Sequence, residues 1–168
     1  MNADTIDTSL ADTILETFRQ VFNSLFMIEL ERGKMSFKSD DFDDCEVAVV
    51  NGVIGENHEG ILACRLSEKT ANNLVSALDM DDEVSTSGEI FYDVIGEWMN
   101  ILAGNVTSDL HKQSIKLYLS PPSIIHGDQF SLQLVQMVPL MVEMRSAAGT
   151  IGVNFAIKKI FHKELNVN

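Results

Sequence analysis

The sequence predicts an α+β fold of two layers, in which two long helices pack on one face of a mainly antiparallel β-sheet. Three observations support this prediction. Apolar residues recur at helical spacing in two long stretches. Shorter apolar runs are joined by turn-rich segments instead of crossover helices, which favours antiparallel pairing. The order of helix followed by strands then repeats in the second half of the chain, which suggests an internal duplication.

The first half of the chain is predicted to hold a long amphipathic helix, a hairpin of two strands and a short helix. These elements fall over about residues 9–31, 46–55, 60–66 and 67–78. Gly33 is a natural stop for the first helix, and the polar segment 34–44 predicts a loop with at most one short strand.

The second half is predicted to hold a longer helix, a short strand, a long apolar strand and a last strand. These elements fall over about residues 85–111, 116–120, 130–144 and 151–157. Pro121 and Pro122 end the short strand, and Pro139 must break the long one or lie at a sheet edge. Gly60 and Gly149 stand before the returning strand of each half, as a duplication would place them.

Length and charge limit the classes of protein to consider. A length of 168 residues predicts a single domain that spans residues 1–168 and is large enough to enclose a core. It has 12 Lys and Arg against 25 Asp and Glu, a formal charge of −13, so phosphate backbones and anionic membranes would repel it. We therefore expect no nucleic acid partner and no membrane insertion.

The two cysteines and the N-terminal segment indicate a cytoplasmic location. Cys45 and Cys64 form neither a disulfide framework nor a zinc-type spacing, and such cysteines are typical of buried positions in a reducing compartment. The first ten residues lack the basic and apolar regions of a signal peptide. No apolar run approaches the roughly 20 residues of a membrane-spanning helix.

The polar side of the helix predicted over 85–111 has an unusual composition. It has no Lys or Arg from Gly88 to His111, and two glycines interrupt it, each costing about 1 kcal/mol relative to alanine. Small residues around an acid and an amide make a low surface on which another backbone could dock. The alternative is an ordinary solvated face, because every amphipathic helix has one.

The run DVIGEWMNILAGN, residues 93–105, resembles the signature helix of the CheC/CheX/FliY family of chemotaxis phosphatases. That signature has Asp or Ser, then Glu four residues later, Asn three residues after the Glu, and a Gly close behind. Asp93, Glu97, Asn100 and Gly104 match it. The segment SPPSIIHG resembles the family's Ser-x-Pro-x-x-Ile-x-Gly. The similarity covers about residues 10–160, and a single signature helix resembles CheX more than CheC.

The resemblance implies a phosphatase that acts on the aspartyl phosphate of a CheY-type receiver. It implies catalytic roles for Asn100, which would position the attacking water, and for Glu97, which would pair with the receiver's active-site lysine. Asp93, Gly96, Ala103 and Gly104 would contact the partner. The receiver would supply its own Mg²⁺, so we expect no metal or cofactor of the chain's own.

Alternatives remain at the level of sequence. The same fold could serve as a non-catalytic adaptor that binds a receiver or a sensory assembly, or as a purely structural partner domain. In the first helix Glu16 is followed by Arg19 where the signature has Asn, so that helix resembles an inactive twin. The four histidines lack ligand spacing. By the resemblance, a homodimer through a sheet edge is also expected.

Overall fold

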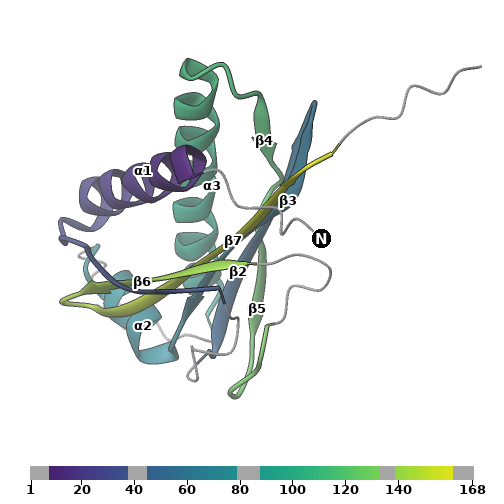
Figure 1. Ribbon diagram of the computed structural model, residues 1–168. Coiled ribbons are helices and arrows are strands. Elements are labelled where there is room, and N and C mark those ends of the chain that lie inside the picture. The colour runs from purple at the N-terminus through teal and green to yellow at the C-terminus, as the bar shows by residue number, and fades with distance from the viewer. Residues whose placement is uncertain (1–7, 38–44, 79–87, 133–138, 161–168) are drawn as a thin grey trace, which may run out of the picture.

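The computed structural model describes residues 8–37, 45–78, 88–132 and 139–160. Their strands form one antiparallel sheet, and the helices lie on one side of it (Figure 1). The helices are α1 (Thr8–Phe26), α2 (Glu68–Ser76) and α3 (Glu89–Lys112). The strands are β1 (Glu31–Ser36), β2 (Val47–Gly55), β3 (His58–Leu66), β4 (Leu117–Leu119), β5 (Ser123–His126), β6 (Leu140–Ser146) and β7 (Gly149–Lys159). The predicted fold class is confirmed.

The order of the strands follows the predicted duplication. The sheet runs β1-β6-β7-β3-β2-β4, and β5 pairs with β2 beyond the end of β4. The hairpins β2–β3 and β6–β7 meet at the centre, where β3 pairs with β7 from His58↔Lys159 to Leu66↔Ile151. The first strand of each half joins the hairpin of the other half: β1 pairs with β6, and β4 pairs with β2.

The core lies between the helices and one face of this sheet. Because side chains alternate across a strand, every second residue of the central strands faces the helices. Val49, Cys64, Val153 and Val142 are register partners on β2, β3, β7 and β6, and all four are fully buried in one row across the sheet. Cys45 is buried as well, so both cysteines occupy the buried positions that were predicted.

The end of the first helix differs from the prediction. Helix α1 ends at Phe26, not near residue 31, and Met27 follows in the left-handed region with φ 54°. This turn lets Leu30 return to the core, where it is 5% exposed, before β1 begins at Glu31. Apolar residues at 28 and 30 continued the helical spacing, although they belong to the entry into a strand. Gly33 therefore stops no helix and lies within β1.

Two other differences concern the second half, and part of it lies outside the described ranges. The strand β5 was not predicted, because Pro121 and Pro122 appeared to end regular structure there, yet Ser123–His126 pairs with β2. Strand β6 begins at Leu140, directly after Pro139. Proline has no N–H to donate to a neighbouring strand, and its position before the strand requires no such hydrogen bond. Residues 133–138 of the predicted long strand and residues 85–87 of the predicted helix lie outside the described ranges.

The two glycines used as signs of duplication serve different purposes. Gly60 lies inside β3, and a Cβ there would overlap the carbonyl oxygen of Ala156 on β7. Gly149 begins β7 with φ +136°, and a Cβ there would overlap Thr70 of α2. The duplication is therefore visible in the strand order and not in these two residues.

The edges of the sheet are short. One edge is β1, which pairs with β6 through a register shift between Arg32 and Met35, and the other is divided between β4 and β5. The homodimer through a sheet edge stays a prediction. None of the helices in the described part of the chain is long and apolar enough to cross a membrane.

Candidate active site

The rotation of α3 about its own axis is fixed by a cluster of aromatic side chains. Trp98 is 2% exposed and meets the rings of Phe18, Phe22 and Phe26 on α1 edge to face, with centroids 5.8, 5.9 and 5.8 Å away. Such edge-to-face pairs favour one relative orientation of the rings. Met99, the next residue, is fully buried too. These contacts set which side of α3 faces outward.

Glu97 and Asn100 flank this buried pair in the sequence, so both are directed to the surface. Together with Asp93 and Gly104 they form an exposed stripe along α3, spaced three or four residues apart. We call these four residues the α3 stripe. Gly96 lies half-buried at its border, and Ala103 is only 9% exposed, so Ala103 offers a partner little surface.

The polar side chains of the α3 stripe are not engaged elsewhere in the described part of the chain: Asp93, Glu97 and Asn100 have no side-chain hydrogen bond or ion pair there. The corresponding residues of α1, Glu16 and Arg19, are paired with each other. Arg19 donates to Glu16 through Nη2 at 2.8 Å and through Nε at 3.1 Å, which lowers the pKa of the Glu16 carboxyl. The twin helix thus neutralises its own acid, while the α3 stripe presents a free acid and a free amide.

The surface around the α3 stripe is low enough for close approach. A Cβ added at Gly104 would meet no atom within 4 Å, and one added at Gly96 would meet only Ile124 Cδ1 at 3.9 Å. A partner backbone can therefore come nearer to α3 at these two points than it could over larger side chains.

One flank of α3 is held by the segment SPPSIIHG. Ser120 bonds to Gly52 of β2 twice: its N–H donates to the carbonyl oxygen at 2.8 Å, and its Oγ accepts from the N–H at 2.9 Å. The side chain of Asn51 donates to the Ser120 carbonyl at 2.7 Å. These bonds fix the start of the segment that carries β5, whose Ile124 lies against Gly96.

Tyr92 and His126 join α3 to β5 on the same flank. The Tyr92 hydroxyl and His126 Nδ1 are 2.9 Å apart. Neither residue has a role predicted from the sequence. The one available signal was the position of His126 inside the segment SPPSIIHG.

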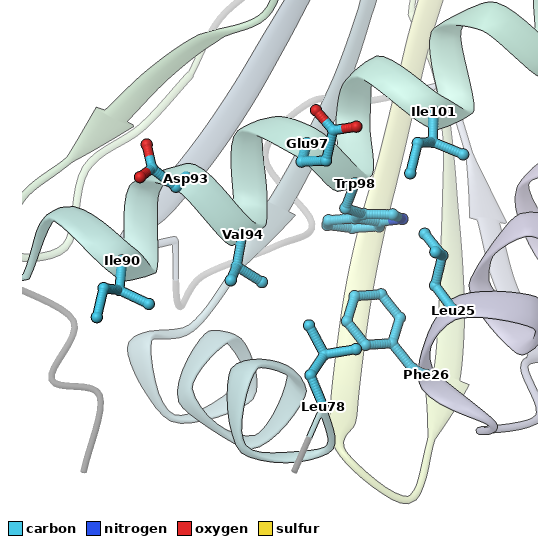
Figure 2. A pocket seen from close by; sticks show the side chains of 9 residues that line it. All are labelled: Leu25, Phe26, Leu78, Ile90, Asp93, Val94, Glu97, Trp98 and Ile101. Atoms are coloured by element: carbon cyan, nitrogen blue, oxygen red, sulfur yellow. The ribbon is translucent and has the colours of Figure 1, made fainter. Parts of the chain in front are cut away.

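The other flank of α3 borders a pocket of about 380 Å³. Figure 2 shows that it lies between the end of α1, Leu78 after α2, and the first half of α3. Its walls are mainly apolar, and Asp93 and Glu97 stand at its edge. Within the described ranges, no three His, Cys, Asp or Glu side chains are grouped so that they could hold a metal ion.

Comparison with known proteins identifies the family. The profile of Chemotaxis phosphatase CheX matches residues 47–145, more than half of the chain. The chain belongs to the CheX family. Membership confirms the predicted resemblance and phosphatase as the class of enzyme, and does not favour an adaptor.

Proteins named CheX are similar to this chain in sequence or in fold. The CheY-P phosphatase CheX of Thermotoga maritima is 28% identical over 128 residues, 76% of this chain and 79% of that protein. CheX in the CheX–CheY–BeF3–Mg²⁺ complex from Borrelia burgdorferi is 25% identical with a TM-score of 0.75, covering 92% of this chain and 99% of that one. Chemotaxis protein CheX from Vibrio vulnificus, 16% identical, shares the fold with a TM-score of 0.80 over 89% of this chain and 99% of that one.

The predicted site residues fall into two groups in this CheX-family structure. Asp93, Glu97, Asn100 and Gly104 lie together on the exposed stripe, with Gly96 at its border. Ala103 lies at the edge of the buried side. The helical spacing predicted the stripe of Asp93, Glu97, Asn100 and Gly104, because residues three and four apart share a face. It also placed Ala103 on that stripe, whereas Ala103 is buried against the core side. The pocket beside them could not be predicted, because α1 and the end of α2 form half of it.

Proposed function

We propose that the chain hydrolyses the aspartyl phosphate of a CheY-type receiver, with Asn100 and Glu97 as the residues that act on the bound phosphoprotein. The observation that carries the proposal is the pair itself: an exposed amide and an exposed carboxylate, one helical turn apart and unengaged among the described residues, on a helix whose rotation Trp98 fixes. The relative from Thermotoga maritima is named a CheY-P phosphatase, and the one from Borrelia burgdorferi is complexed with CheY.

The proposed reaction needs little covalent chemistry from the chain. A water oxygen attacks phosphorus in line, the bond from phosphorus to the receiver's aspartate oxygen breaks, and the aspartate leaves as a carboxylate while both protons of the water stay with the phosphate as dihydrogen phosphate. The amide of Asn100 accepts a hydrogen bond from this water and can donate another, which holds the nucleophile in line. Mg²⁺ and charge stabilisation come from the receiver.

Glu97 fixes the register of docking. Its carboxylate, one turn before Asn100, pairs with the receiver's active-site lysine and thereby places the amide over the phosphoryl group. Asp93 extends the acidic stripe, and Gly96 and Gly104 allow the receiver backbone to approach. Ala103, 9% exposed, adds little to this surface. The proposed reaction places the chain in the cytoplasm, which suits its two unbridged cysteines.

The test follows the loss of phosphate from Mg²⁺-bound, phosphorylated receivers in the presence of each variant. We expect Asn100→Ala to bind the receiver normally and to lose activity by at least about 100-fold, the effect of a misplaced reactant. Glu97→Ala should weaken binding as well. Asn105→Ala is the matched control, because Asn105 is an exposed amide of the same helix, about 140° around from Asn100.

Each outcome decides a different claim. Normal turnover by Asn100→Ala would refute the role of the amide. Tight receiver binding by wild type without faster phosphate loss would replace the phosphatase with an adaptor. Loss of activity in Asn105→Ala to the same degree would mean that any polar change on α3 disturbs the enzyme, and the assignment to Asn100 would fail.

A further inference from the structure

The pocket beside α3 has the composition of a docking site for an apolar side chain. Leu25 of α1, Leu78 after α2, and Ile90, Val94 and Ile101 of α3 supply walls that open to the surface (Figure 2). Ile90 is 44% exposed although it is a large apolar residue. Apolar hollows rimmed by polar side chains are typical of binding sites.

The pocket is continuous with the α3 stripe. Asp93 and Glu97 belong to both, and Figure 2 shows their carboxylates directed away from the apolar side chains, on the far side of the helix ridge. An occupant that enters the pocket from the α3 stripe must therefore pass two negative charges. The nine residues that line the pocket include no Lys or Arg.

These features favour one class of occupant. We propose that the pocket receives an apolar side chain of the receiver. This side chain belongs to the segment that carries the receiver's active-site lysine, and the segment crosses α3 with the lysine on the side of Glu97 and the apolar residue on the side of the pocket. The inference rests on the proposed function: a lysine paired with the Glu97 carboxylate lies across the ridge of α3 from the apolar walls, so residues next to it in the receiver chain can reach over the ridge to the opening of the pocket.

A second copy of this chain is a poorer occupant. Its formal charge of −13 repels another copy, and it would bring a further acidic surface toward Asp93 and Glu97. A receiver segment that contains a lysine complements the same two carboxylates.

The test uses two variants that alter the pocket and leave the four residues of the α3 stripe unsubstituted. Val94→Phe fills the pocket from a half-buried position, and Ile90→Lys places a positive charge at its exposed edge. Ile54→Lys is the matched control, because Ile54 is 66% exposed and faces away from the helices, its neighbour Val53 being part of the core. Thermal unfolding of each variant checks that the fold is retained.

We expect affinity for a beryllofluoride-activated receiver to fall about tenfold in both pocket variants, the size expected when one aliphatic contact is lost. The rate at saturating phosphorylated receiver should stay unchanged, and Ile54→Lys should match wild type. Alanine at the apolar receiver residue beside its lysine should cause the same loss, and combining it with Val94→Phe should add little further loss.

The outcomes separate this inference from the proposed function. If Asn100→Ala is inactive while both pocket variants bind the receiver as wild type does, the pocket is not a receiver site and the phosphatase assignment stands. If wild type accelerates no phosphate loss from any receiver, the proposed function fails first. If the pocket variants change the sedimentation of the chain alone and leave receiver affinity intact, the occupant is a second copy.

Discussion

Replacing Trp98 separates the packing of its ring from the burial of its N–H. Its indole Nε1 is buried and has no hydrogen-bond acceptor among the described residues, which costs about 1–3 kcal/mol. Trp98→Phe removes that N–H and keeps a ring that can meet Phe18, Phe22 and Phe26 edge to face. The smaller ring gives up about 1–2 kcal/mol of apolar burial. The two effects nearly offset each other, so we expect a change in unfolding free energy within about 1 kcal/mol.

Trp98→Leu is the informative comparison. It keeps an apolar side chain but loses three aromatic pairs, each contributing about 0.5–1.5 kcal/mol beyond its buried area. With the cavity that remains, we expect a loss of roughly 3–5 kcal/mol. Urea unfolding followed by circular dichroism measures both variants, because Trp98 is the only tryptophan and its fluorescence disappears with it. If Trp98→Phe costs as much as Trp98→Leu, the N–H is satisfied and the reasoning is wrong.

Three further predictions concern other parts of the chain. Thr17→Val removes the 2.8 Å hydrogen bond that the buried Thr17 hydroxyl donates to Asp109, so we expect a loss of about 1.5 kcal/mol at neutral pH. Hydrogen bonds from Lys112 and Thr17 lower the pKa of the Asp109 carboxyl from its ordinary value of 3.8. The stability that the ionised carboxylate contributes is therefore present above pH 3.8 and is lost as the pH falls through the lowered pKa. The difference in unfolding free energy between wild type and Thr17→Val should shrink in that acid range, and a difference that stays constant during acid titration would contradict the assignment. Gly104→Ala should raise the free energy of unfolding by about 0.5–1 kcal/mol, because no atom obstructs the new Cβ, while receiver affinity falls; thermal melting and receiver titration check the two halves, and unchanged affinity would remove Gly104 from the docking surface. The Cys64 thiol, fully buried and with its pKa raised by burial, should resist a thiol reagent in native buffer and react in urea, and rapid labelling of the native chain would show that the core opens.

The parts of the fold that the sequence predicted well are those with a strong period. Helix α3 keeps apolar residues at helical spacing over its whole length, so its position and its exposed stripe followed from counting residues. The hairpin of β2 and β3 has apolar runs on both sides of a short turn, so its two strands followed in the same way.

The parts that the sequence could not predict depend on distant partners. The segment ERGKMS of β1 has no apolar alternation, and it is a strand because β6 offers an edge to it. Strand β5 follows two prolines and is held by Ser120 and β2. The pocket needs α1, the end of α2 and α3 at once, so no local pattern could indicate it.

The exchange of first strands between the two halves has a consequence for how the protein is made. Strand β1 is synthesised early but pairs with β6, which comes much later in the chain. Strand β3 likewise pairs on one side with β7, and this pairing joins residues as far apart as 58 and 159. A nascent chain that stops before Gly149 holds neither half of the sheet in its final form. Contacts of such separation slow folding, so we expect the chain to acquire its structure only after the ribosome has released the last hairpin.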